Sequence, residues 1–441
     1  MCLISNNMFV KKLDYVNPLK LYNVLRDEDF PFILESADKH ERKARYTFVS
    51  ANPDFIIEID EKGTRVDGKL ISKEINPFKA LKGLEMENVD GKRFNGGFVG
   101  YIAYDAVHNY IDGEIEETSV FGYYSNVFVY DHISNLFYFV SLNKDEETAK
   151  EAERIVRKAK RTKIEDEECY SDVIRCDADK ETFMEMVEKA KEFVYAGDVF
   201  QVVISREYEV DTDFSPFQIY RNLRKINPSP YMFCLEFGKS LVGASPETMC
   251  SVEKNVIKVN PIAGTAPRGR NEEEDRAIAE RLLNDEKERA EHVMLVDLAR
   301  NDVRKVSKAG SVKVTMFMEV LRYSHVQHIE SEVVGVLDSD MFDAVEACFP
   351  AGTLTGAPKV RAMEIIDELE RSKRRVYGGC VGYFSVCGYA DMAIAIRMVE
   401  IDDVYRVRAG AGIVADSNPE REFLETERKM SAVLKALEVV E

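Results

Sequence analysis

The stretch from Glu286 to Asp302 constrains the fold of this chain more than any other. It begins with charged side chains, runs through an apolar middle that only Asp297 interrupts, and ends on Arg300-Asn301-Asp302. This pattern is typical of a helix that is buried around most of its circumference. Such a helix needs the rest of the chain packed around it.

Two carboxylates lie near the start of this predicted helix. Glu288 and Glu291 are three residues apart, so on a helix they share one face at the mouth of the buried segment. Carboxylates placed in this way can bind a hard cation such as Mg²⁺, which also leaves positions open for oxygens of a substrate. The alternative is a solvated acidic first turn that stabilises the helix N-terminus.

Length and composition predict a globular protein. The 441 residues suffice for two or three ordinary domains, or for one large domain with a smaller partner, and 45% of them are hydrophobic. No apolar run approaches the roughly 20 residues of a membrane span. Met1 to Val10 lacks the layout of a signal peptide. We therefore expect a cytoplasmic protein without a membrane partner.

The formal net charge of -19 argues against a nucleic-acid partner, because binding to a phosphate backbone needs clustered Lys and Arg. An acidic chain that binds an anionic substrate must concentrate positive groups locally or use a metal ion. The eight cysteines are scattered and have neither zinc-ligand nor thioredoxin spacing, so we expect reduced thiols.

Region 1–143 is predicted to form antiparallel strands at 31–37, 46–50, 55–60, 65–71, 95–105 and 136–142. The glycine-rich strand 95–105 resembles a phosphate loop, but no Lys-Ser/Thr follows it. The charged region 144–178 is expected to be an exposed helix, to about residue 168, and a linker. A helix at 183–195 and a strand at 199–210 should open the region 179–441. Without a regular βαβ period, the fold class is expected to be α+β with large, mainly antiparallel sheets.

Several polar groups in region 179–441 are embedded in apolar or glycine-rich surroundings. They are Ser245-Pro246-Glu247, Pro261 to Thr265, Arg322 to Val326, Pro350 to Lys359, Tyr377-Gly378-Gly379, Ile396-Arg397, Ala409 to Ser417 and Glu425 to Lys429. Each one alone has a structural explanation: glycines as turn residues, His325 as a hydrogen-bonded core histidine, Glu425 as a solvated helix charge.

In this order, however, the series resembles the chorismate-utilising enzymes, and most closely their anthranilate synthase component I branch. The resemblance is dense over residues from about 180 to 438 and extends more thinly through Leu34-Glu35-Ser36 and Gly96 to Tyr101. It implies an α/β sandwich of two facing sheets with outer helices. It also implies conversion of chorismate and ammonia to anthranilate and pyruvate, the first committed step of tryptophan biosynthesis.

The resemblance assigns roles to individual residues. It makes Glu291 and Glu425 the Mg²⁺ ligands, supported by Glu288, with the metal holding the ring carboxylate of chorismate. The remaining substrate contacts would come from Tyr377 and Arg397, from the backbone N–H groups of Gly410, Ala411 and Gly412, and from Thr353 and Lys429. Glu247 is the expected general acid and His325 the expected base.

Two positions help to choose among the chemistries of the family. In relatives that add water, a lysine base occupies the position of Gln201, and glutamine cannot take that proton. In the aminodeoxychorismate synthases, a potential lysine nucleophile typically occupies the position of Ala263. Direct amination to anthranilate is therefore expected. The alternatives are an aminodeoxychorismate synthase and a regulatory protein that binds tryptophan or chorismate without catalysis.

No cysteine lies in the glycine-flanked turn with a histidine partner that a glutamine-hydrolysing enzyme needs. We therefore expect ammonia as the substrate, supplied by a separate glutamine amidotransferase subunit in a hetero-oligomer. Leu34-Glu35-Ser36 and Asn227 to Phe233 resemble segments that bind tryptophan as a feedback inhibitor. The contacts would come from Glu35, Ser36, Asn227, Pro228, Tyr231 and Met232. The alternative interpretations are a strand end and a Pro-terminated strand entry, but the match of two segments so far apart in the sequence favours a shared site.

Overall fold

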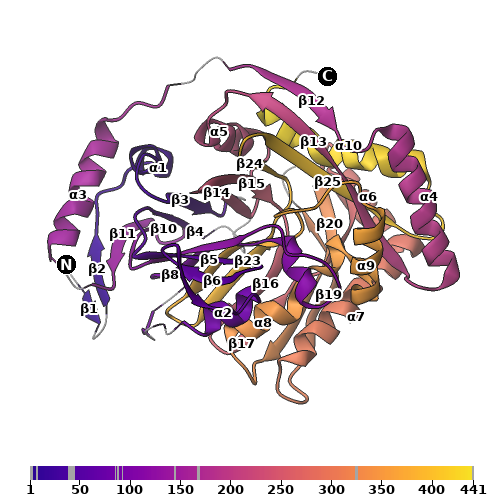
Figure 1. Cartoon of the computed structure of the whole chain (residues 1–441), viewed down its shortest axis with the longest axis horizontal. Coiled ribbons are helices and arrows are strands. Elements are labelled where there is room, and N and C mark those ends of the chain that lie inside the picture. Colours follow the sequence, from indigo (N-terminus) through magenta and orange to yellow (C-terminus); the bar gives the residue numbers. More distant parts are fainter. Residues whose placement is uncertain are drawn as a thin grey trace.

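The computed structural model describes residues 3–5, 8–37, 45–84, 86, 89–91, 93–143, 146–165, 169–322 and 326–439. These residues form two large antiparallel sheets with helices packed around them, as the α+β prediction requires (Figure 1). Among the described residues, no helix is long and apolar enough to cross a membrane.

The first sheet draws its strands from both ends of the chain. In spatial order they are β1 (Leu3–Ser5), β2 (Met8–Lys12), β11 (Leu136–Ser141), β10 (Asn126–Asp131), β4 (Tyr46–Ser50), β3 (Phe32–Glu35), β14 (Tyr231–Phe237), β15 (Lys239–Ser245), β24 (Met398–Ile401), β25 (Tyr405–Ile413), β13 (Gln201–Thr212) and β12 (Ser171–Cys176), with β21 (Gly356–Ala357) beside β13.

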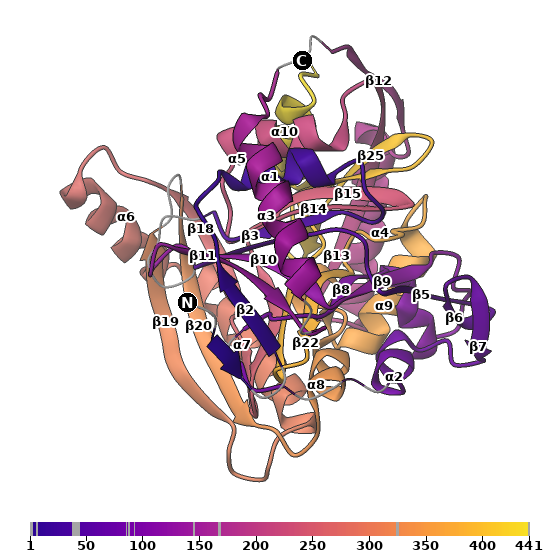
Figure 2. The same cartoon turned by 90° about the vertical axis from the view of Figure 1, so that its left-hand side faces the viewer.

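The second sheet is built in the same way. Its order is β18 (Ile262–Pro267), β20 (Val326–Val336), β17 (Val256–Val259), β16 (Thr248–Glu253), β23 (Tyr389–Ile394), β22 (Cys380–Ser385), β8 (Gly97–Ile102), β9 (Ser119–Tyr124), β5 (Phe55–Asp60), β6 (Gly63–Val66) and β7 (Lys69–Ser72), with β19 (Lys313–Arg322) beside β20. Figure 2 shows the two ends of this sheet, with β19 and β20 at the left and β6 and β7 at the right.

Regions 1–143 and 179–441 contribute strands to both sheets. In the first sheet β3 pairs with β14, and in the second β8 pairs with β22. The two regions are therefore separate in the sequence, but they share both sheets. Between them, α3 (Glu146–Arg161) is the exposed helix that the charge pattern predicts, whereas the edge strand β12 was not foreseen.

An aromatic core fills the space between the sheets. The rings of Phe48 from the first sheet and Tyr383 from the second have centroids 5.6 Å apart, and those of Phe32 and Tyr124 are 4.7 Å apart. These side chains are almost completely buried. Removing such large apolar surfaces from water holds the sheets face to face.

The helices cover the outer faces of the sheets. On the first sheet α1 (Pro18–Leu25), α3, α5 (Pro216–Ile226) and α10 (Pro419–Ala436) share one apolar cluster. Figure 1 shows α10, in yellow, beside β25, which it contacts. The other helices are α2 (Pro77–Lys82), α4 (Lys180–Ala196), α6 (Glu272–Asn284), α7 (Glu286–Lys305), α8 (Met341–Cys348), α9 (Lys359–Leu369) and the 3-10 turns η1 (Tyr104–Asn109) and η2 (Gly352–Leu354).

Two local predictions were wrong. The segment 65–71 is not one strand but the hairpin of β6 and β7, because Asp67 and Gly68 both adopt positive φ angles of 47° and 73° and form a tight turn. The second wrong prediction concerns helix α7, which was expected to be buried around most of its circumference. The helix itself is confirmed, but it is buried along one stripe only, and Val293 on its other side is 48% exposed. The helix packs on the outside of the second sheet through contacts with β17, β18 and β20, so its far side faces solvent.

Candidate active site

The first turns of α7 position two of the predicted metal ligands. The Asp285 carboxylate caps the helix by accepting hydrogen bonds from the backbone N–H groups of Lys287 and Glu288, at 3.0 and 3.1 Å. The Glu288 carboxylate lies over Gly264, where an added Cβ would be 3.0 Å from Oε2. Burial raises the pKa of the Glu288 carboxyl, and the negative charges of Glu291, Asp285 and Glu425 raise it further.

Helix α10 brings the third carboxylate and a cation. Glu425 and Lys429 are four residues apart, so they lie on one face, with Lys429 Nζ 3.5 Å from Glu425 Oε1. Lys429 Nζ also donates a hydrogen bond of 2.9 Å to the carbonyl oxygen of Gly410 on β25. Burial lowers the pKa of Lys429, while the adjacent carboxylate of Glu425 opposes that shift.

Gln201 joins the strands to α7. It is the first residue of β13, and its Nε2 donates a hydrogen bond of 3.0 Å to Glu291 Oε1. Gly412 lies beside this side chain, and a Cβ at Gly412 would clash with the same Nε2 atom. Because Gly412 has no side chain, Gln201 has the space to reach the Glu291 carboxylate.

Glu247 and Thr353 meet although they are far apart in the sequence. Thr353 Oγ1 donates a hydrogen bond of 2.8 Å to Glu247 Oε1. Glu247 lies between β15 and β16, and Thr353 lies in η2. The contact brings together the expected general acid and a residue that was predicted from a different motif.

Arg397 and Tyr377 complete the set of predicted substrate contacts. Arg397 has a φ of 53° in the loop between β23 and β24, and its Nη1 donates a hydrogen bond of 2.6 Å to the carbonyl oxygen of Lys429. Burial lowers the pKa of Arg397. Burial raises the pKa of Tyr377 to about 12, and the guanidinium of Arg374 opposes part of that rise.

The backbone of β25 offers fewer N–H groups to one ligand than predicted. Gly410, Ala411 and Gly412 pair with Ser205, Ile204 and Val203 of β13. Successive N–H groups of a strand point to opposite edges, so Gly410 and Gly412 share one edge and Ala411 faces the other. The three N–H groups therefore cannot converge on one carboxylate.

The predicted base, His325, lies outside the described residues. A second histidine, His328, lies three residues further along the chain and was not among the predicted site residues. Its Nδ1 lies 2.9 Å from the carbonyl oxygen of Gly264 and 3.1 Å from Thr265 Oγ1. Because a carbonyl only accepts, Nδ1 carries the proton in the neutral ring and Nε2 carries the lone pair of a base. The pairing of β18 with β20 places His328 opposite Thr265, a contact that the sequence alone does not reveal.

The three carboxylates suit a hard cation in their donor chemistry. Oxygen donors of Glu288, Glu291 and Glu425 are the kind that Mg²⁺ prefers. Burial and then repulsion from the neighbouring carboxylates raise the pKa of Glu288, and a cation would relieve that repulsion. In the part of the chain that the structure describes, no three His, Cys, Asp or Glu residues are already close enough together to hold a metal ion.

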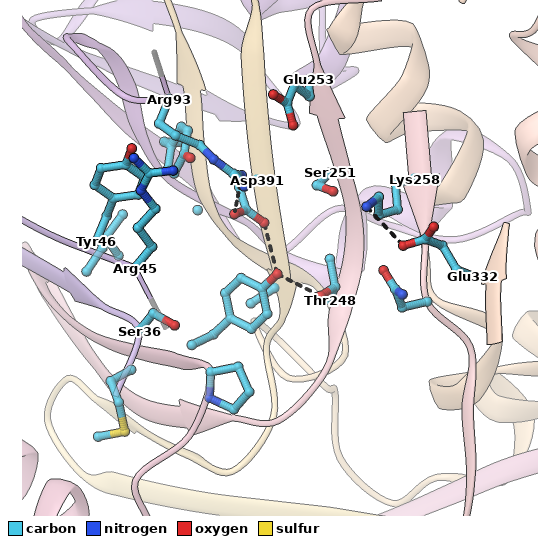
Figure 3. Close-up of a pocket in the computed structure, with 18 of the residues that line it drawn as sticks. Ser36, Arg45, Tyr46, Arg93, Thr248, Ser251, Glu253, Lys258, Glu332 and Asp391 are labelled. Atoms are coloured by element: carbon cyan, nitrogen blue, oxygen red, sulfur yellow. Dashed lines mark hydrogen bonds and ion pairs between the residues drawn. The ribbon is translucent and has the colours of Figure 1, made fainter. Parts of the chain in front are cut away.

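A separate cavity of about 1110 Å³ lies between the sheets and is lined by both segments predicted to bind an inhibitor. Strands β3 and β14 pair so that Glu35 lies opposite Met232, and Ser36, Tyr231 and Met232 line the cavity (Figure 3). Asn227, in contrast, caps the C-terminus of α5, and neither it nor Pro228 is among the lining residues.

The Glu35 carboxylate already has partners. Arg224 donates to it through Nε at 2.6 Å and Nη2 at 2.9 Å, and the Tyr220 hydroxyl donates at 2.8 Å. A ligand ammonium at Glu35 would therefore have to share this carboxylate with a bidentate arginine.

The cavity is adjacent to the cluster around Glu247. The Tyr231 hydroxyl lies 2.6 Å from Thr248 Oγ1 and donates to Asp391 Oδ1 at 3.0 Å (Figure 3). Thr248 directly follows Glu247 in the chain. One hydrogen bond therefore connects Tyr231 in the cavity wall to the residue that follows the expected general acid.

The chain belongs to the family of chorismate binding enzymes, whose model matches residues 30–435. It is 62% identical over 437 residues to the anthranilate synthase component 1 of Thermococcus kodakarensis, covering 98% of this chain and 100% of that one. It is 55% identical over 430 residues to the anthranilate synthase component 1 of Archaeoglobus fulgidus, covering 97% and 100%. The crystal structure of anthranilate synthase component I from Streptococcus pneumoniae superposes with a TM-score of 0.80 at 36% identity, covering 88% of this chain and 92% of that one.

Proposed function

We propose that this chain is the aminating subunit of an anthranilate synthase, which converts chorismate and ammonia to anthranilate, pyruvate and water. The observation that carries the proposal is the convergence of α7, α10, β13 and β25 through Gln201–Glu291 and Lys429–Gly410. This convergence gathers carboxylates and cations from motifs that are up to about 225 residues apart in the sequence. The identity to anthranilate synthase relatives over the full chain supports the same conclusion.

In the first step, ammonia bonds to the ring carbon next to the one that bears the carboxylate, and the 4-hydroxyl leaves as water. Hydroxide is a poor leaving group, so Glu247 donates the proton that the departing oxygen needs. Thr353 holds the Glu247 carboxyl through its hydrogen bond of 2.8 Å. Arg397 and Lys429 offset the charge of the dianionic substrate.

In the second step, a base removes the ring proton while the enolpyruvyl group leaves as pyruvate, which makes the ring aromatic. His325 remains the candidate from the sequence. His328 is the candidate from the geometry, because its Nδ1–H donates to Gly264 and its Nε2 carries the lone pair. Replacing each with Gln separates them, since only the base variant should accumulate the aminated, non-aromatic intermediate.

Mg²⁺ is part of this proposal, with Glu291 and Glu425 as its ligands and Glu288 in support. When bound, the ion would hold the ring carboxylate and stabilise negative charge that develops during elimination. Gln201 fixes the orientation of the Glu291 carboxylate through its hydrogen bond.

Aminodeoxychorismate synthesis is the second candidate, and Ala263 weighs against it. Ala263 lies on β18 opposite Ile329 and is 8% exposed, so the position offers no nucleophile to the substrate. Gln201 likewise lacks the basic group that addition of water would need. A regulator without catalysis is disfavoured because Glu247 and the carboxylates on α7 and α10 are all present.

The amidotransferase subunit and the tryptophan inhibitor also belong to this proposal. The cavity between the sheets, lined by Ser36, Tyr231 and Met232, would take tryptophan, and a separate subunit would supply ammonia. Such an inhibitor would act by favouring a conformation that binds chorismate poorly.

The test is product analysis with the purified chain, chorismate, ammonium chloride and Mg²⁺. We expect anthranilate, detected by its fluorescence, together with an equal amount of pyruvate. Accumulation of aminodeoxychorismate without pyruvate would favour the second candidate. Formation of isochorismate, or no turnover at all, would overturn the proposal.

A further inference from the structure

Arg374 is a buried cation that the steps above do not use. It lies in the loop between α9 and β22, and its side chain is 1% exposed. Its Nη2 donates a hydrogen bond of 2.7 Å to Glu370 Oε1, and its Nε donates one of 3.0 Å to Oε2. A guanidinium so deeply buried is retained only when its donors are satisfied.

The remaining donors of Arg374 reach two backbone segments of the candidate active site. Nη1 donates at 2.6 Å to the carbonyl oxygen of Leu354, which directly follows Thr353. Nη2 donates at 2.9 Å to the carbonyl oxygen of Val203, which is opposite Gly412 and two residues after Gln201.

The face of the guanidinium contacts a third segment. Its carbon lies 5.8 Å from the centroid of the Tyr377 ring and 4.7 Å from that of Tyr104. A Cβ added at Gly378, the residue after Tyr377, would lie 3.5 Å from Nη1, so the guanidinium is in van der Waals reach of this segment. One planar side chain therefore touches the segments that carry Thr353, Gln201 and Tyr377.

We propose that Arg374 is a positioning residue of the chorismate site, which holds these three segments in one arrangement so that Thr353 orients Glu247. The catalytic meaning of this inference rests on the proposed function. Only arginine suits the position, because a lysine has no planar fork with which to bind two carbonyls and a carboxylate while it stacks on rings.

Arg408 provides a matched control. Its side chain is 2% exposed and belongs to the same buried network, with Nη1 3.5 Å from Glu370 Oε2. Its hydrogen bonds, however, go to Ser205 Oγ at 3.1 Å, to Glu207 Oε2 at 3.3 Å and to Ser372. Arg408→Lys disturbs the network to a similar degree without releasing the carbonyl of Leu354.

The first measurement is hydrogen exchange of the purified full chain without substrate. In Arg374→Lys, we expect at least about fivefold faster exchange in peptides covering residues 352–355, because the carbonyl that anchors this turn is released. Arg408→Lys should leave these peptides unchanged. Unchanged exchange in Arg374→Lys would overturn the inference whatever the activity of the protein.

The second measurement is a double-mutant cycle with Thr353→Ala. If Arg374 acts through Thr353, Arg374→Lys should lower kcat/KM for chorismate about 30-fold in the wild-type background and about threefold or less in the Thr353→Ala background. Arg408→Lys should lower it by the same small factor in both. Additive losses for Arg374→Lys would mean a general structural role and would overturn the inference.

The proposed function and this inference can fail separately. If the function is wrong, the wild-type chain makes no anthranilate. The exchange measurement still decides whether Arg374 holds the turn. If Arg374→Lys does not fold, Glu370→Gln weakens the same anchor with little change of volume. The same changes in exchange and in the cycle are then expected at smaller size, and their absence contradicts the inference.

Discussion

His292 on α7 shows how burial sets the protonation of a single side chain. It directly follows Glu291, is completely buried, and its Nε2 lies 2.6 Å from Ser331 Oγ. Burial lowers the pKa of His292 to about 4. The folded protein therefore keeps this ring neutral at pH values where an unfolded chain would protonate it.

This difference predicts a loss of stability in mild acid. The folded pKa lies below the unfolded value, so the contribution is complete above about pH 6.5 and is lost as the pH falls toward 4. At pH 5 the loss should be about 2 kcal/mol of unfolding free energy. Urea unfolding of the wild type and of His292→Gln at pH 7.5 and pH 5 measures it. Equal losses in both proteins would contradict the assignment.

Some site residues were predictable because local spacing reveals them. The helical period places Glu288 beside Glu291 without any knowledge of the fold, whereas Glu425 and Lys429 were predicted from the family resemblance. The partners of Glu35 were not predictable, because Tyr220 and Arg224 lie 185 and 189 residues away along the chain. The contacts of Arg374 were not predictable for the same reason, because its acceptors Leu354 and Val203 belong to other elements.

At the level of elements, the pairing of β3 with β14 explains how the predicted inhibitor segments meet. Each segment alone is an ordinary strand end. Pairing places Glu35 opposite Met232 and aligns Ser36 with the wall of the cavity. Local sequence indicated the strands but not their order, because strand order in large sheets depends on pairings between distant parts of the chain.

Ser36→Phe should relieve inhibition by tryptophan, because the larger ring would fill the end of the cavity that Ser36 lines. We expect the inhibition constant to rise at least about tenfold while uninhibited turnover stays within about twofold, measured by anthranilate fluorescence.

Ser251→Phe is the control. It adds the same ring on the opposite wall of the cavity, whose volume of about 1110 Å³ still leaves the Ser36 end open to tryptophan (Figure 3). Tryptophan and chorismate should weaken each other's binding by the same factor. If calorimetry detects no binding of millimolar tryptophan to the wild type, the regulatory proposal fails and the catalytic one stands.

At the level of the whole molecule, the described strands from regions 1–143 and 179–441 are shared between two large sheets. Cys380, the cysteine nearest to a glycine-flanked setting, is fully buried on β22, and burial raises the pKa of its thiol. A nucleophilic cysteine needs a lowered pKa and access to solvent. Cys380 therefore does not suit this chemistry.

We accordingly predict that the purified chain is active with ammonium salts alone. Glutamine should support activity only after a separate amidotransferase subunit has been added, because ammonia must then be released elsewhere. Turnover assays with each nitrogen source, with and without that subunit, measure this. Glutamine-dependent turnover by this chain on its own would contradict the prediction.

If α7 and α10 together hold the Mg²⁺ that binds chorismate, as we propose, then Glu425→Gln removes one of its ligands. Glu420→Gln is the matched control, because Glu420 lies on the same helix but is exposed and pairs with Lys180 at 2.6 Å. Anthranilate formation is measured for both variants as Mg²⁺ is raised from limiting to saturating concentrations. We expect Glu425→Gln to lose at least about 100-fold in kcat/KM at limiting Mg²⁺ with an unchanged unfolding midpoint, while Glu420→Gln stays within about twofold of the wild type. Near-normal activity of Glu425→Gln at limiting Mg²⁺ would contradict the claim.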